Sequence, residues 1–251
     1  MKILLRLQYL GTGFCGWQFQ PGVRTVQNTL TEAAESLFGK KCGITGCSRT
    51  DSGVHANDFA ATVELPKGAN RIPAERIPTA FAPFLPHDLA VKSAVVVPDE
   101  FHPRYDVQSK EYLYKVHLAP VADPFLYGRV WHYAGRVLPD AVERMNECAE
   151  KLVGTKQFAS FMAAGSKIED TERTVYYCTV TREGDMLHIR VAADGFLYNM
   201  VRIIVGTLMQ AAVGKLTPAE MEAIIEAKDR KAAGVTAPSD GLYLNKVTYP
   251  E

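Results

Sequence analysis

The apolar residues of this chain repeat with two different spacings, and this alternation is the feature that most constrains the fold. Residues 3–9 alternate between apolar and polar side chains, which is the period of a half-buried strand. Residues 26–38 carry an apolar stripe at helical spacing, with Thr25 ahead of it as an N-cap and Gly39 behind it. A purely helical or purely β fold is therefore excluded, and the chain is predicted to be α+β.

The same two patterns continue along the chain and predict a series of further elements. Strands are expected over 43–49, 59–65, 90–97, 110–118, 175–182, 186–191 and 242–249, and helices within 72–85 and over 140–152, 198–213 and 218–228. Mainly antiparallel sheets with helices on one face fit this order. We expect two α+β halves, residues 1–105 and 106–251.

Composition narrows the class of protein. The chain has 251 residues, 47% of them hydrophobic, which is ordinary for a globular protein and argues against disorder. No apolar run approaches the roughly 18 residues of a membrane helix, and the amino terminus does not read as a signal peptide. The five cysteines are an odd number without CxxC spacing, so we expect reduced thiols in a cytoplasmic protein. The scattered histidines predict no protein-held metal.

Gly11, Gly13 and Gly16 form a GxGxxG pattern directly after the first strand, where a dinucleotide fold would hold a pyrophosphate. That motif needs its last glycine to open a helix, but here the chain runs into the turn Pro21-Gly22. A nicotinamide oxidoreductase is therefore disfavoured. A glycine-rich turn after an edge strand is the preferred interpretation.

The segment Asp51-Ser52-Gly53 has two interpretations. Asp followed by Ser-Gly is a common β-turn whose carboxylate accepts backbone amides. Arg49 stands two residues earlier, and a nearby cation keeps a carboxylate ionised, as a nucleophile requires. From chemistry alone, Asp51 is a candidate nucleophile.

The wider sequence resembles the tRNA pseudouridine synthase A family. Residues 49–55 match the RTD-A/S-GVH active-site loop of that family. Six further motifs follow the family order, namely Gly16-Trp17-Gln18 with Thr25-Val26-Gln27, Phe101-His102 with Arg104, Tyr112-Leu113-Tyr114, Arg173-Thr174-Val175, Phe196-Leu197 with Met200-Val201-Arg202 and Gly206, and Gly241-Leu242-Tyr243-Leu244. The resemblance covers nearly the whole chain.

The resemblance implies the pseudouridine synthase fold, with two RNP-like halves that meet at a central cleft and carry helices on their outer faces. It implies an isomerase that converts uridine to pseudouridine at positions 38, 39 and 40 of the tRNA anticodon stem-loop. The enzyme is expected to need no cofactor or metal, to bind tRNA and to form a homodimer.

The site residues are likewise implied by the resemblance. Asp51 matches the nucleophile, Tyr112 the tyrosine that packs on the target base, and Arg202 the arginine that pairs with the catalytic Asp. Arg49 is expected to help flip the nucleotide, and Arg24 and His55 are assigned to substrate binding. From the residues alone, Tyr112 also fits a core aromatic beside Tyr114, and Arg202 must be paired because it interrupts an apolar run.

Six positions depart from the family pattern: Ser48, Ala82, Val107, Lys156, Gln157 and Asn199. None is the nucleophile, its arginine or the tyrosine, so the departures bear on substrate range. The alternative function is a non-catalytic RNP-type RNA-binding module in which Asp51 is only a turn residue. The aromatic and basic signature of RNP sheets is absent, which disfavours it.

The formal net charge is zero, which taken alone argues against a nucleic-acid partner. The predicted helices 26–38, 139–153 and 217–231 together carry a net charge of −5, however, so the rest of the chain carries +5. Segregation of charge therefore predicts a basic surface on a neutral protein.

Overall fold

The computed structural model describes residues 1–66, 68, 72–166 and 168–250. The chain divides into two compact units. The first contains residues 1–108 and 243–251, and the second contains residues 109–242. The division expected from the sequence, 1–105 and 106–251, differs because the last strand joins the first unit. The predicted cleft concerns the relative placement of the halves and stays a prediction.

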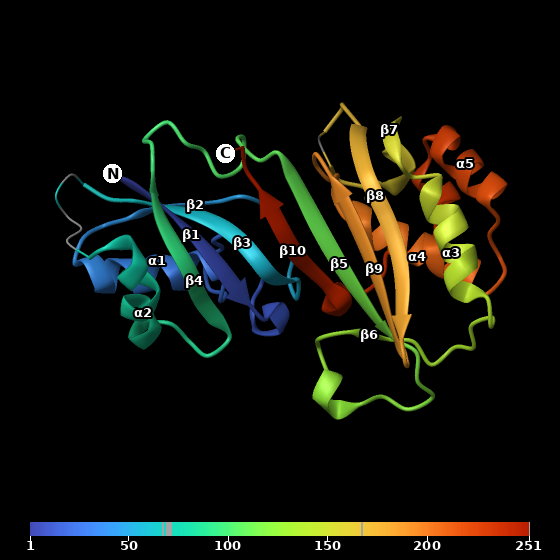
Figure 1. The fold of residues 1–251 in the computed structure, drawn as a ribbon, viewed down its shortest axis with the longest axis horizontal. Helices are drawn as coiled ribbons and strands as arrows, with labels where there is room; N and C mark the ends of the chain where they lie inside the picture. Colours follow the sequence, from blue (N-terminus) through green and yellow to red (C-terminus); the bar gives the residue numbers. More distant parts are fainter. Residues whose placement is uncertain (67, 69–71, 167, 251) are drawn as a thin grey trace. The chain divides into compact units, whose positions relative to one another are not determined.

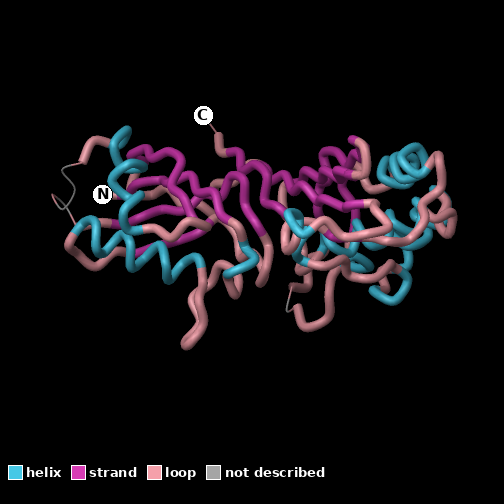
Figure 2. Tube along the Cα trace, turned by 90° about the horizontal axis from the view of Figure 1, so that it is seen from below, coloured by secondary structure: helices cyan, strands magenta, loops and turns pink. Residues whose placement is uncertain are grey.

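The first unit is a sheet with helices on one face (Figures 1 and 2). Its strands lie in the order β4-β1-β3-β10. Strand β2 pairs with the C-terminal end of β3, where Gly43 lies opposite Glu64. All these pairs are antiparallel except β10 with β3, in which Tyr243 lies opposite His55. The bounds are β1 (Lys2–Tyr9), α1 (Val26–Phe38), β2 (Gly43–Gly46), β3 (His55–Glu64), α2 (Ile77–Phe81), β4 (Leu89–Val97) and β10 (Leu242–Thr248).

Helix α1 shows why the sequence folds as it does. The Thr25 side chain accepts a hydrogen bond from the Asn28 backbone N–H, which contributes about 1 kcal/mol at a helix start. Gly39 ends the helix in the left-handed conformation, at φ 64°. The buried stripe of Val26, Leu30, Ala33 and Ala34 packs toward the core of this unit, as the sequence predicted.

Two features of the first unit differ from the sequence-based expectation. Strand β1 is not an edge strand, because Leu5 lies between Ala61 of β3 and Ala94 of β4. Strand β3 begins at His55 rather than near residue 59. The polar residues that made 55–58 look like a turn are paired: Asn57 donates to the Asn245 side chain at 2.7 Å, and Asp58 accepts from Arg6 at 3.1 Å.

The second unit is also a mainly antiparallel sheet with helices on one face. Its strands lie in the order β5-β9-β8-β7, with the short β6 parallel to β5. The bounds are β5 (Ser109–His117), β6 (Trp131–His132), α3 (Ala141–Glu150), β7 (Gly154–Gln157), β8 (Glu172–Glu183), β9 (Met186–Ala193), α4 (Met200–Ala212) and α5 (Pro218–Ala227).

The core of this unit lies between α3, α4 and the inner face of the strands, where Met145, Ile189 and Leu208 are fully buried. The predicted hairpin is confirmed, because β8 and β9 pair around Gly184. Strands β6 and β7 were not predicted, because segments this short have too few apolar residues to show a period. The α+β class and the mainly antiparallel pairing are confirmed.

Candidate active site

Asp51 lies in the loop between β2 and β3, in a β-turn that the chain closes at Val54. The Val54 N–H donates to the Asp51 carbonyl at 3.2 Å, and Gly53 has a φ of 81°. A positive φ at the third turn residue is the type II geometry that glycine favours. The turn interpretation of this segment is therefore correct for the backbone, and it leaves the Asp51 side chain half-exposed on a defined loop.

The glycine-rich segment 11–16 packs against this loop and fixes it. The Trp17 N–H donates to the Thr50 carbonyl at 3.0 Å, and the Gly53 N–H donates to the Phe14 carbonyl at 3.3 Å. The chains approach so closely that a Cβ on Gly11 would lie 2.0 Å from the Val54 carbonyl oxygen. The glycines thus allow backbone contact with the Asp51 loop. No helix opens at Gly16, so the dinucleotide pattern is a coincidence, as predicted.

His55 supports the other end of the loop. Its ring is completely buried, and Nδ1 accepts a hydrogen bond from the Gly11 N–H at 2.9 Å. The ring also stacks on Tyr243 with centroids 4.5 Å apart. Because Nδ1 accepts, the proton of the neutral ring is on Nε2. The arrangement holds the loop in place, and the predicted substrate contact of His55 stays a prediction.

The two arginines assigned to this unit differ in their surroundings. Arg49 is exposed and lines a cavity beside the Asp51 loop. Arg24 instead forms a bidentate pair with Asp88, at 2.7 and 2.6 Å, and its guanidinium lies 4.0 Å above the Phe14 ring. The hydrogen bond that Arg24 donates to the Asp88 carboxylate raises the pKa of Arg24. Arg24 thus contacts the glycine-rich segment at Gly13 and Phe14 and stabilises it.

Tyr112 belongs to the second unit, at the middle of β5, opposite Val191 of β9. Its ring is buried and packs in a T-shaped arrangement with the Phe196 ring, with centroids 5.0 Å apart. Tyr114 points to the same face, where its hydroxyl donates to the Pro238 carbonyl at 2.7 Å. Burial raises the pKa of Tyr114, against the opposing effect of Arg202. Tyr112 therefore packs as a core aromatic, and its predicted contact with the target base stays a prediction.

Arg202 stands in the first turn of α4 and is half-buried. Its Nε donates to the Ala237 carbonyl at 2.7 Å, and one terminal nitrogen donates to the Asn199 side-chain oxygen at 2.8 Å. Asn199 precedes the helix in the left-handed conformation, at φ 60°. Arg202 therefore has two neutral hydrogen-bond acceptors within its own unit. Its predicted partnership with Asp51 joins residues of different units and stays a prediction.

Arg202 and helix α4 are held by residues to which the sequence analysis assigned no role. Asn199, named there only as a departure, orients Arg202. The segment 233–237 crosses α4 so closely that a Cβ on Gly206 would lie 1.8 Å from the Val235 carbonyl oxygen. Gly206 belongs to one of the family motifs. A glycine between the larger residues of this helix is the sequence feature that could have indicated the close approach of another segment.

The other departures lie in varied places. Ser48 lines the same cavity as Arg49, and Ala82 is exposed on a short turn after α2. Lys156 and Gln157 stand on β7, where the Gln157 amide oxygen accepts from Thr171 at 2.7 Å. Val107 is half-buried near the end of the first segment of unit one.

All five cysteines lie in the described part of the chain and are thiols, as predicted. Within that part no helix is long and apolar enough to pass through a bilayer. The same residues contain no cluster of three or more His, Cys, Asp and Glu side chains that could hold a metal ion.

Comparisons with known proteins give consistent matches. The sequence profile described as tRNA pseudouridine synthase matches residues 7–106 and 148–250. A Bacillus subtilis protein named tRNA pseudouridine synthase A is 43% identical over 99% of both chains. Proteins of the same name from Thermoanaerobacter and Geobacter are 40% and 39% identical, over at least 99% of each chain.

A solved structure of a Cbf5-Nop10-Gar1 complex gives a TM-score of 0.37 at 14% identity, covering 82% of this chain and 53% of that one. This value is too low to support an argument about the fold.

Proposed function

This chain belongs to the tRNA pseudouridine synthase family and is an isomerase of tRNA uridines, and we propose that Asp51 is its nucleophile. We further propose that its targets are the uridines at positions 38, 39 and 40 of the anticodon stem-loop. The observation that carries the assignment of Asp51 is the fixed loop 49–55. Its backbone is hydrogen-bonded to residues 14 and 17 through Gly53 and Thr50, and its His55 side chain accepts from the Gly11 N–H.

In the proposed reaction, the Asp51 carboxylate attacks the uridine at carbon 6 of the base or at carbon 1 of the ribose. The glycosidic bond between N1 and the ribose breaks, the uracil turns, and carbon 5 forms the new bond to the ribose. The bond to the carboxylate breaks again, the proton on carbon 5 leaves, and N1 gains a proton. Reactant and product have the same composition, so the reaction consumes neither an oxidant nor an energy donor. A carboxylate on a fixed loop suits this chemistry because rigid placement lowers the entropy cost of attack.

The second unit supplies the remaining proposed roles. Tyr112 packs on the target base and assists proton removal at carbon 5, and Arg202 pairs with the Asp51 carboxylate to keep it ionised. The support for Arg202 is its half-buried guanidinium, held by Asn199 and Ala237 in one orientation. Arg49 helps to extrude the uridine from the stem, since a base inside a helix is out of reach of the nucleophile.

The test is the substitution Asp51→Asn, assayed for pseudouridine in a tRNA transcript with no cofactor added. We expect no product and an unchanged far-UV circular dichroism spectrum. Asp99→Asn is the matched control, because Asp99 is an exposed aspartate of the same unit that pairs with the amino terminus. Turnover by Asp51→Asn would refute the assignment. tRNA binding without product by the unaltered chain would instead favour the non-catalytic RNA-binding module.

Three finer properties are part of the proposal. The tRNA positions are tested by mapping pseudouridine in total tRNA from cells with and without this gene. The homodimer is tested by light scattering, which should give twice the monomer mass. We place the protein in the cytoplasm, where its thiols would stay reduced and tRNA is available, and cell fractionation tests this.

A further inference from the structure

A cavity of about 210 Å³ opens beside the Asp51 loop in the first unit, and its rim is cationic. The two cations are Arg49 and Arg104, and the rings of His102 and Tyr105 line the cavity beside them. No carboxylate is among the described residues of this lining. A cavity of this charge favours an anionic ligand.

The floor of the cavity is preformed. The Trp17 ring stacks on Phe59 with centroids 4.3 Å apart. The Gln27 amide accepts from the Phe19 N–H at 2.9 Å and donates to the Ile44 carbonyl at 3.0 Å. Both side chains are therefore held by partners within the unit, so this part of the lining is preformed.

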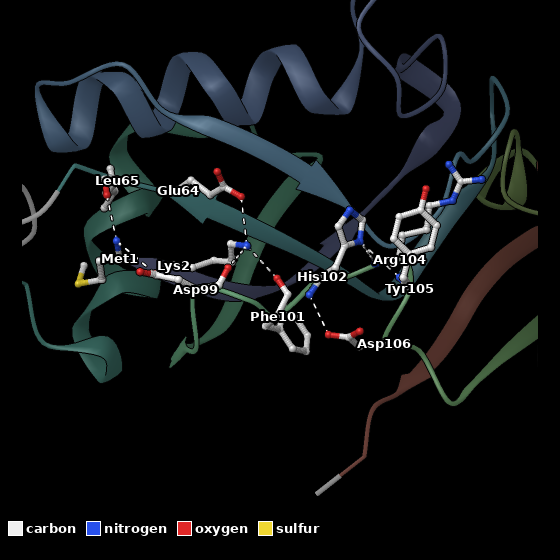
Figure 3. Close-up of polar contacts among 10 residues, drawn as sticks. All are labelled: Met1, Lys2, Glu64, Leu65, Asp99, Phe101, His102, Arg104, Tyr105 and Asp106. Carbon is white, nitrogen blue, oxygen red and sulfur yellow. Dashed lines mark hydrogen bonds and ion pairs between the residues drawn. The ribbon is translucent and has the colours of Figure 1, made fainter.

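The segment 102–106 is closed on itself by hydrogen bonds, as Figure 3 shows. The His102 Nδ1 accepts from the Arg104 N–H at 3.1 Å and the Tyr105 N–H at 3.3 Å. The Asp106 carboxylate accepts from the His102 N–H at 2.8 Å. These bonds use Nδ1 as an acceptor, so the proton of the neutral His102 ring is on Nε2.

Among the aromatic residues that line the cavity, Trp17 is buried but Tyr105 is exposed. One face of its ring lies against His102, with centroids 4.3 Å apart, yet 74% of the residue is exposed. The Arg104 guanidinium lies 5.8 Å from the ring centroid. An exposed, oriented aromatic ring beside cations is the combination that proteins use to stack a nucleic-acid base and bind its phosphate.

We propose that this cavity is a nucleotide subsite for the substrate RNA. A base that flanks the reacting uridine stacks on the exposed face of Tyr105, and its phosphate binds between Arg104 and Arg49. The inference rests on the proposed function, because Arg49 links the cavity to Asp51 two residues further along the same loop. Tyr105 and Arg104 then act in binding and take no part in bond making.

The test measures binding of a tRNA transcript in the Asp51→Asn background, where turnover does not interfere. Loss of one stacked base should weaken binding about tenfold in Tyr105→Ala, while Tyr105→Phe should bind like its parent. Arg104→Ala should weaken binding and reduce the slope of log K against log salt by about 0.7 to 0.9, the value for one phosphate. Tyr127→Ala and Arg76→Ala are matched controls, since both are exposed residues outside the cavity.

The proposal is overturned if Tyr105→Ala and Arg104→Ala bind the transcript as tightly as the two controls do. Arg104 is exposed, so its variant keeps the test valid even if Tyr105→Ala were to unfold. Product formation by the chain with Asp51 intact separates this failure from that of the proposed function. An active enzyme indifferent to Tyr105 and Arg104 refutes only the subsite, and an inactive chain whose RNA binding still depends on them refutes only the isomerase mechanism.

Discussion

A methyl group on Gly16 would lie 2.6 Å from the carbonyl oxygen of Thr50. This approach brings the glycine-rich segment into contact with the residue that precedes the proposed nucleophile. It also explains a glycine pattern that imitates a dinucleotide site. The position of Asp51 thus depends on the absence of a side chain 35 residues earlier in the chain.

Gly16→Ala should therefore reduce both the free energy of unfolding and the activity. The new methyl group either displaces the Asp51 loop or leaves the backbone strained. Gly22→Ala is the matched control: its φ of 78° equals that of Gly16 within a few degrees, but no described atom lies within 4 Å of its Cβ. The conformational strain of each should cost about 1–3 kcal/mol, and only Gly16→Ala should also lose turnover. Urea denaturation and tRNA turnover measure the two effects. Equal turnover in both variants would contradict this account.

His55 should act on stability more than on substrate affinity. His55→Phe keeps a ring to stack on Tyr243 but leaves the buried Gly11 N–H without an acceptor, which costs about 1–3 kcal/mol. His55→Asn offers a side-chain oxygen in place of Nδ1 and should recover part of this loss. The free energy of unfolding in urea checks the order. An unchanged stability of His55→Phe, with a raised KM for tRNA, would instead support the predicted substrate contact.

Asn199 should matter for catalysis as a positioning residue for Arg202. Asn199→Ala removes the 2.8 Å acceptor of the guanidinium, and hydrogen bonds to charged groups are worth about 1.5–3 kcal/mol. We expect kcat to fall about tenfold or more with little change in KM. Asn199→Asp keeps an acceptor and should restore most of kcat.

Asn199→Gly separates this role from backbone strain. Glycine adopts the φ of 60° at residue 199 more readily than asparagine, so stability should hold or rise while kcat stays low. Full activity in Asn199→Gly would show that the side chain does not position Arg202.

The five thiols should react in an order set by exposure and pKa. Cys15 is exposed and should react first with a thiol reagent at pH 8. Burial and Glu35 raise the pKa of Cys42, while burial raises that of Cys148 to about 11 and that of Cys178 to about 12. A raised thiol pKa leaves less reactive thiolate at a given pH, so these three should react more slowly and speed up as the pH rises. Timed labelling with mass spectrometry checks the order, and rapid reaction of Cys178 in the folded protein would contradict it.

Much of the fold was predictable because local patterns agree with the structure. The stripe from Val26 to Leu30, the cap at Thr25 and the turn at Gly39 define α1 to the residue. The predictions failed where pairing over long distances decides the structure. Polar Asn57 and Asp58 lie inside β3 because partners from β10 and β1 satisfy them, and those partners are not adjacent in sequence.

The site was predictable in part for the same reason. The loop around Asp51 has a turn signature of its own, and the family motif names the residue. The support that Gly11 and Phe14 provide depends on contacts with Gly53, Val54 and His55, which lie far along the chain, so no local pattern encodes it. Chemistry could likewise show that Arg202 needs a partner, but it could not identify Asn199 or the Ala237 carbonyl.

The parallel pairing of Tyr243 with His55 has a consequence for the order of synthesis. A ribosome makes β10 after every strand and helix of the second unit, yet β10 completes the sheet of the first. While the second unit is synthesised and folds, the first unit should therefore lack the β10 partner of β3. Strand β3, which begins at His55, then gains its β10 partner only after the whole second unit has been made, so a nascent chain stalled before residue 243 would present an unfinished catalytic loop.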